Sequence, residues 1–209
     1  MTPTVKIRQH TNTQIFILMI AFISLLAGCK KEIDFKDTDP LPPFQRPVVE
    51  LSGNIIGERL LDRDSVYRLN GVVNVGIDSI QASTTPQATG IIRIEDGTVI
   101  IGKKGSTGAN PGTLLIHRGS KIYAEGTASN PIIFTSAETT KTPGDWGGLV
   151  ICGRATNNQP GGYATLEGSY GGHHGGSDDA DNSGIVKYVR LEYAGYPILT
   201  DKEINSLTM

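Results

Sequence analysis

The chain has 209 residues and a formal net charge of −2, with 26 glycines and few aromatic side chains. The nearly balanced charge excludes the electrostatic footprint of a nucleic-acid-binding protein, so no nucleic acid is expected as a partner. Abundant glycine together with frequent β-branched residues favours short strands joined by tight turns over helices.

Residues 1–28 have the pattern of a signal peptide. Lys6 and Arg8 precede an uncharged, mostly apolar run over residues 15–28. This run is shorter than the roughly 20 residues of a bilayer-spanning helix and is typical of the apolar part of a signal peptide. It ends in Leu-Ala-Gly-Cys at residues 26–29, which resembles the lipobox of bacterial lipoproteins. The resemblance implies cleavage before Cys29 and a multi-chain lipid anchor on it; an ordinary secretory signal with an incidental cysteine is the alternative.

Residues 29–47 are expected to form a disordered tether, because they are charged, rich in proline and without apolar periodicity. Lys30 stands where an aspartate is linked to inner-membrane retention in this class of lipoprotein. The resemblance therefore implies the outer membrane, on its periplasmic or cell-surface face. Cys152 would be the remaining thiol of the mature chain, so no intramolecular disulfide is expected. Because Cys152 lies in an apolar segment, we expect it to be buried.

Two segments, 92–102 and 114–126, are similar to each other at a spacing of 22 residues. In each segment, alternation separates an apolar face from a more polar one. The first face is expected to carry Ile92, Ile94, Leu114 and Ile116, and the second Arg93, Glu95, Leu115 and His117. A repeat this short cannot enclose its own core and must stack on its neighbours, so we predict Ile94 directly above Ile116 in parallel pairing.

Further strand-like segments follow without convincing helical periodicity between them, at 131–136, 149–152, 185–195 and 203–208. Parallel strands normally need helical crossovers, which a coiling chain avoids. Hairpin dipeptides are scarce, which disfavours the competing β-sandwich. The sequence therefore predicts an all-β parallel β-helix over residues 48–209.

Five segments are distinctive: IEDGTVIIGKKG, LLIHRGSKIYAEGTASNPIIFTS, WGGLVICGRA, GGSDDADNSGIVKYVRLEYAG and EINSLTM. They resemble successive coils of a family of right-handed β-helix envelope lipoproteins from Gram-negative bacteria. The resemblance implies a right-handed solenoid over 48–209, with residues 76–90 as an insertion between the first strands. Members of that family continue through several more coils, so the chain is expected to be a partial member that stops at Met209 inside a strand.

The densest polar stretch lies at residues 171–184. Asp179, Asp181 and Ser183 have the spacing that opens an EF-hand calcium loop, but Arg190 stands where that loop needs a glutamate. A shorter Ca²⁺ site on a turn is the candidate, and a solvated acidic turn is the alternative. Its candidate ligands are Asp178, Asp179, Asp181 and Asn182. The neighbouring His173 and His174 should point in opposite directions on an extended backbone and so not share an ion.

Polysaccharide lyases and hydrolases of the β-helix fold carry their acids and bases on the outer face of one sheet. The outward candidates in this chain are Glu95, His117, Arg190 and Glu192, of which Glu95 and His117 could stack across adjacent coils. No paired carboxylates beside a base can be recognised, so no catalytic residue is assigned. Five aromatic residues could form a sugar-stacking surface: Trp146, Tyr163, Tyr170, Tyr193 and Tyr196.

The sequence therefore predicts an outer-membrane or cell-surface lipoprotein whose β-helix is a non-catalytic binding or structural module. A polysaccharide is the candidate ligand, and the lipid anchor makes the membrane a partner. No cofactor is expected apart from the candidate Ca²⁺. The alternative is a fragment of a polysaccharide lyase or glycoside hydrolase of the same fold.

Overall fold

The computed structural model describes residues 45–78, 86–106, 109–166, 170–199, 202–203 and 205–209. The predicted signal peptide, Cys29 and nearly all of the predicted tether lie outside these residues, so their interpretation stays a prediction. Within the described part of the chain, no helix is long and apolar enough to cross a membrane.

The regular elements are strands, and nearly all of them pair in parallel. In chain order they are β1 (Val48–Ile55), β2 (Gly57–Leu61), β3 (Val66–Val75), β4 (Gly90–Ile94), β5 (Val99–Gly102), β6 (Thr113–Ile116), β7 (Lys121–Glu125), β8 (Ile132–Ser136), β9 (Leu149–Ile151), β10 (Tyr163–Thr165), β11 (His173–Gly175), β12 (Gly184–Lys187), β13 (Val189–Leu191), β14 (Pro197–Leu199), β15 (Lys202–Glu203) and β16 (Leu207–Thr208). The exceptions are the antiparallel pairs β10–β11 and β14–β15.

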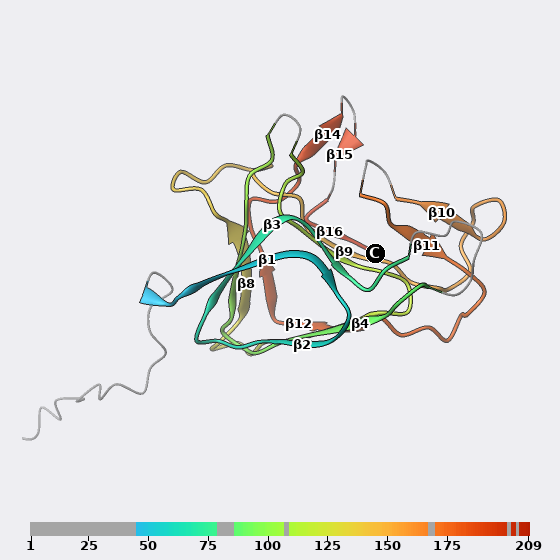
Figure 1. Ribbon diagram of the computed structural model, residues 1–209, viewed down its shortest axis with the longest axis horizontal. Helices are drawn as coiled ribbons and strands as arrows, with labels where there is room; N and C mark the ends of the chain where they lie inside the picture. Colours follow the sequence, from blue (N-terminus) through green and yellow to red (C-terminus); the bar gives the residue numbers. More distant parts are fainter. Residues whose placement is uncertain (1–44, 79–85, 107–108, 167–169, 200–201, 204) are drawn as a thin grey trace, which may run out of the picture. The chain divides into compact units, whose positions relative to one another are not determined.

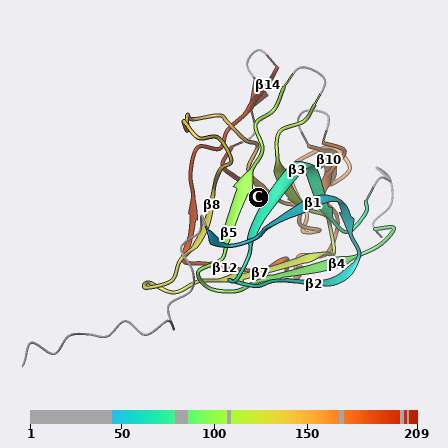
Figure 2. The same ribbon diagram turned by 60° about the vertical axis from the view of Figure 1, so that its left-hand side comes forward.

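Two parallel sheets wind around one core. The smaller has four strands in the order β12-β7-β4-β2, and the larger has eight in the order β13-β8-β5-β3-β6-β9-β16, with β1 also paired to β3. Figure 1 shows the smaller sheet along the lower side, with β8 at the left and β9 and β16 above it, and Figure 2 shows the same arrangement after a turn. This confirms the predicted parallel β-helix.

The larger sheet bends into two faces along β3. Val66–Leu69 of β3 pairs with β5, and Val72–Val75 pairs with β6. Gly71 lies between these halves with a φ of 72°, a conformation that glycine adopts at little cost. We call the side built by β5, β8, β13 and the first halves of β1 and β3 the first face. The second face is built by β6, β9, β16 and the second halves of β1 and β3.

The inward side chains of the three sides form the core, as the alternation predicted. Ile92, Ile94, Leu114 and Ile116 are all at most 4% exposed. Leu115 and His117, expected on the outer face, are also buried, at 0% and 4% exposed. Leu115 is covered by a second apolar cluster outside the second face, in which Leu115 and Val150 pack with Tyr170 and Leu166 from the segment around β10 and β11.

The predicted stacking of Ile94 on Ile116 is wrong. Ile94 pairs with Ala124 of β7, whereas Ile116 pairs with Val75 and Ile151. The two similar segments are successive corners of the coil: 92–102 leads from the smaller sheet into the first face, and 114–126 leads from the second face back to the smaller sheet. Both corners need a glycine at positive φ, Gly97 at 78° and Gly119 at 75°, which makes their sequences alike.

Candidate functional site

A groove runs along the outside of the first face. Its floor is an apolar ladder in register across four strands, with Val48 beside Val66, Val66 beside Val99, and Val99 beside Ile133. Arg190 of β13 follows Ile133 in the same register. The hollow above this floor has a volume of about 470 Å³. Its lining also includes Arg46, Ile101, Thr135, Ser136, Ala137, Lys141 and Glu192.

Three cations and one carboxylate line the groove. Arg46 donates from Nη1 to the carbonyl oxygen of Gly97 at 3.0 Å. Lys141 donates from Nζ to the carbonyl oxygen of Ser136. Arg190 and Glu192 form an ion pair of 2.7 Å with side chains 57% and 31% exposed. The described lining therefore combines an apolar floor with three cationic side chains and one carboxylate.

Thr135 is the most distinctive polar group in the groove. It lies on β8 between the inward-facing Phe134 and the fully buried Ser136, and it is only 8% exposed. Its hydroxyl Oγ1 has no hydrogen-bond partner among the described residues. A buried hydroxyl without a partner costs free energy, but this oxygen is closed to solvent, so a ligand in the groove does not reach it.

The outward candidates from the sequence do not form one site. Arg190 and Glu192 both line the groove. Among the described residues of its lining, no second carboxylate accompanies Glu192. Glu95 instead pairs with Arg63, accepting its backbone N–H at 3.2 Å. The predicted stack of Glu95 on His117 is wrong, because Glu95 follows the end of β4 while His117 precedes the start of its neighbour β7.

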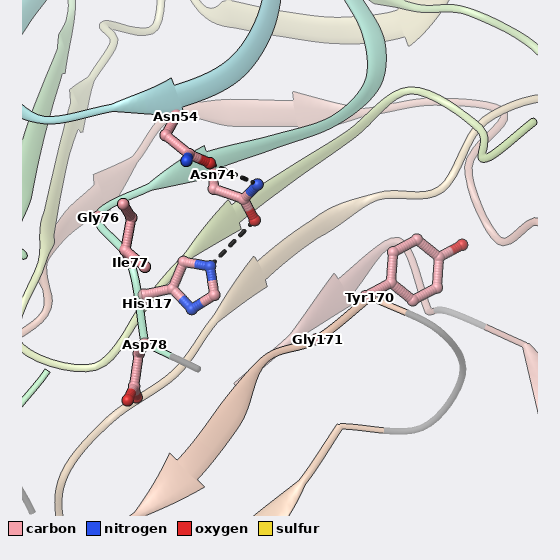
Figure 3. Close-up of a pocket in the computed structure, with 8 residues that line it drawn as sticks. All are labelled: Asn54, Asn74, Gly76, Ile77, Asp78, His117, Tyr170 and Gly171. Carbon is pink, nitrogen blue, oxygen red and sulfur yellow. Dashed lines mark hydrogen bonds between the residues drawn. The ribbon is translucent and has the colours of Figure 1, made fainter. Parts of the chain in front are cut away.

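A second, smaller pocket lies beside the second face, with a volume of about 180 Å³. Figure 3 shows its residues: the His117 ring lies below Asn74, and Tyr170 lies across the pocket. Asn74 donates from Nδ2 to Oδ1 of Asn54 at 3.0 Å. His117 Nε2 lies 3.0 Å from Oδ1 of Asn74. Asn54, Asn74 and His117 thus form a hydrogen-bonded chain along one wall.

A buried ion pair lies next to this pocket. Arg118 donates from Nη2 to Oδ1 of Asp78 at 2.9 Å and from Nε to Oδ2, and its Nη1 bonds the carbonyl oxygen of Gly175 at 3.1 Å. The hydrogen bonds that Arg118 donates to Asp78 raise the pKa of Arg118 above its usual value. Burial is the main cause that lowers the pKa of His117 below 6.5, so its imidazole is neutral at neutral pH.

The acidic turn is organised around Arg154. Arg154 Nη2 bonds Asp178 at 2.7 Å, and its Nε bonds Asp181 at 3.1 Å. Asp179 accepts the backbone N–H of Thr156, and Asn182 accepts that of Gly184. Across the described residues, no group of three or more His, Cys, Asp or Glu side chains could hold a metal ion. The Ca²⁺ site stays a prediction.

The two histidines of β11 point to different partners. His173 is 5% exposed and its Nδ1 lies 3.0 Å from the carbonyl oxygen of Asp78. His174 Nδ1 lies 3.2 Å from Nδ2 of Asn157. The expected opposite orientation of adjacent side chains on an extended strand is confirmed.

The aromatic surface expected from the sequence is only partly on the surface. Trp146 is 0% exposed and Tyr170 is 7% exposed, whereas Tyr193 is 39% exposed. Trp146 as a sugar-stacking platform is therefore wrong, because its ring lies in the core. The prediction that Cys152 is buried is confirmed, and burial raises its pKa to about 12, which keeps the thiol protonated.

Sequence reasoning missed Arg46, Thr135 and Lys141 in the groove and the two asparagines beside His117. In the sequence, Asn54 and Asn74 are visible only as single asparagines in two separate segments. The pairing of β1 with β3 brings them side by side, because it places Asn54 opposite Asn74.

One comparison with known proteins gave a match. Residues 53–209 match the family model of the pectate-lyase-like beta helix domain. Neither the curated proteins nor the solved structures gave a significant match.

Proposed function

We propose, given that the chain belongs to the family of pectate-lyase-like β-helix domains, that it binds an acidic polysaccharide in the groove of the first face without cleaving it. The observation that carries this proposal is the composition of the groove. An apolar floor of valine and isoleucine suits the CH-rich faces of sugar rings, and Lys141 and Arg190 suit carboxylate or sulfate groups.

The groove also crosses the strands, so it follows the stacking direction of the solenoid. Five strands contribute to it, from β1 to β13, and neighbouring strands lie about 4.8 Å apart. A linear polymer can therefore contact several coils at once.

The side chains of the described lining support a binding role without cleavage. General acid–base cleavage of a glycosidic bond needs a positioned acid and a base or nucleophile. Glu192 is the carboxylate in the described lining, and Arg190 holds it in an ion pair. The competing function is that of a lyase or hydrolase fragment, which the same fold would also support.

The binding proposal predicts that Arg190→Gln and Lys141→Gln together weaken binding of polygalacturonate about tenfold or more. The reason is that each lost charge-assisted hydrogen bond at an exposed site contributes on the order of 1 kcal/mol. Calorimetric titration of the full chain in detergent measures the affinity, which should also fall with added salt. Arg93→Gln, on the smaller sheet, is the matched control and should leave the affinity unchanged.

Two outcomes would contradict this proposal. Equal binding of neutral dextran and polygalacturonate would remove the role of the cations. Release of unsaturated uronates or of new reducing ends from the polymer would show cleavage and favour the enzyme alternative.

We further propose that Cys29 anchors the protein to the outer membrane. The support is the sequence at residues 26–29 and the apolar run before it. Because several acyl chains are needed for stable attachment, Cys29→Ser should abolish labelling with a fatty-acid analogue and release the protein into the soluble fraction. Fractionation after a salt wash measures this, with Cys152→Ser as the control that should stay in the membrane. A Cys29→Ser protein that stays with the membrane would contradict the anchor.

A further inference from the structure

A cluster of charged and titratable side chains fastens β11 to the outside of the second face. Arg118, from the corner after β6, donates from Nη1 to the carbonyl oxygen of Gly175 at 3.1 Å. In the opposite direction, Nδ1 of His173 lies 3.0 Å from the carbonyl oxygen of Asp78, which follows β3. Because a carbonyl oxygen only accepts, Nδ1 of His173 is the donor. Both bonds therefore join β11 to the residues around His117.

His117 is a buried base within this cluster. Asn74 uses its NH₂ group to donate to Asn54, so its oxygen Oδ1 accepts from Nε2 of His117, as Figure 3 shows. The neutral imidazole thus carries its proton on Nε2, and Nδ1 is the nitrogen that titrates. Nδ1 is closed to solvent and has no hydrogen-bond partner among the described residues. A proton therefore reaches Nδ1 only when the segment that covers it moves away.

The surroundings of His117 oppose a charge on its ring. The charged and titratable groups that act on it are Asp78, Arg118 and His173. Burial opposes the imidazolium most strongly, and the neighbouring Arg118 and His173 add to this, against the weaker attraction of Asp78. Both oxygens of Asp78 are already bonded by Arg118. These causes hold the pKa of His117 below 6.5 as long as β11 is in place.

The balance between a closed and an open β11 therefore depends on pH. In the open state, the exposed imidazole of His117 regains its usual pKa of about 6.5 and binds a proton that the closed state does not bind. The closed state is fully favoured above about pH 6.5 and loses stability as the pH falls below this value. Uptake of one proton raises the equilibrium constant of opening about tenfold between about pH 7.5 and pH 5.5.

We infer that acid releases the segment 170–175 from the second face, with His117 as the group that takes up the proton. Release breaks the hydrogen bond from the N–H of Gly175 to the carbonyl oxygen of Gly153, which is 2.8 Å long. It also uncovers Leu115, which packs with Tyr170 in the second apolar cluster. No residue of this device lines the groove, so the inference is independent of the proposed polysaccharide binding.

Hydrogen exchange at the amide of Gly175 tests the inference in the full chain in detergent. After division by the intrinsic rate at each pH, protection of this amide is expected to fall about tenfold from about pH 7.5 to pH 5.5. The amide of Glu95, which bonds the carbonyl oxygen of Leu61 at another corner, is the reference and should keep its protection. Constant protection at Gly175 would overturn the inference. An equal fall at Glu95 would also overturn it, because acid would then weaken the whole fold.

His117→Gln is the decisive variant, because glutamine can still donate to Asn74 but does not titrate in this range. In this variant the protection of Gly175 should no longer depend on pH. The matched control His174→Gln, on the same strand, should keep the tenfold fall. A tenfold fall that persists in His117→Gln would overturn the role of His117.

A second measurement needs no variant. In the native chain labelled with ¹⁵N-histidine, the Nδ1 resonance of His117, assigned through its bonds to the backbone, should titrate with a midpoint below about pH 6.5. A midpoint at or above this value would mean that closure does not oppose protonation, and would overturn the inference.

Discussion

Replacing Asp78 by asparagine is expected to lower the free energy of unfolding by about 3–5 kcal/mol, because it removes the carboxylate that forms a buried, two-bonded ion pair with the guanidinium of Arg118. The side chains of this ion pair are 1% and 0% exposed for Arg118 and Asp78. Arg118 also bonds the carbonyl oxygen of Gly175, so the pair joins the segment after β3 to β11, far apart in the sequence. Urea unfolding followed by far-ultraviolet circular dichroism measures the loss.

The matched control is Glu58→Gln, the same change of carboxylate to amide in an exposed pair. Glu58 bonds Arg93, and the two side chains are 55% and 45% exposed. Exposed pairs contribute at most about 1 kcal/mol, so this variant should unfold nearly as the native chain does. The double variant Asp78→Leu/Arg118→Met should regain part of the loss, since it removes both buried charges. Equal effects of Asp78→Asn and Glu58→Gln would contradict the role assigned to the buried pair.

The fold class could be read from the sequence because burial in a strand leaves a local trace. The alternation around Ile92 and Leu114 correctly placed the inward side chains. The register could not be read, because the coils differ in length. Ile92 pairs with Ile122, 30 residues further on, whereas Val73 pairs with Leu114, 41 residues further on. Loops of different lengths between the strands hide the repeat length of the coil. The similar sequences around Gly97 and Gly119, which are two corners of one coil, give a false repeat of 22 residues.

The candidate sites were less predictable because long-range pairing creates them. The cations Arg46 and Lys141 lie outside the strands, where no periodicity marks a position as facing the groove. The acidic turn was visible as a cluster of aspartates, but Arg154, which binds Asp178 and Asp181, precedes them by 24 and 27 residues. A local sequence pattern shows where carboxylates cluster. It does not show which distant residue pairs with them in the fold.

Replacing Trp146 by alanine is the second change with a large expected effect, a loss of about 3–5 kcal/mol in the free energy of unfolding. Trp146 is fully buried and stacks on Phe134 with ring centroids 6.2 Å apart. Its Nε1 donates to the carbonyl oxygen of Glu192 at 2.7 Å. Truncation therefore opens a cavity in the core and leaves a carbonyl oxygen without its donor. Chemical denaturation measures the loss, and Tyr188→Ala, at a site 53% exposed, should cost less than about 1 kcal/mol.

Gly102 allows a sharper test of the same packing. A Cβ atom at Gly102 would lie 2.5 Å from Cγ of Trp146, so Gly102→Ala forces the indole away from its place. Overpacking of this kind costs about 1–3 kcal/mol. In the Trp146→Ala background the clashes with Cγ and Cδ2 of the indole are gone, and the Cβ atom of residue 146, 2.6 Å from the added methyl group, has a cavity into which it can shift. The two losses should therefore not add. Strictly additive losses in this double-mutant cycle would mean that the indole does not pack on Gly102, and would remove the reason why a glycine is needed at the end of β5.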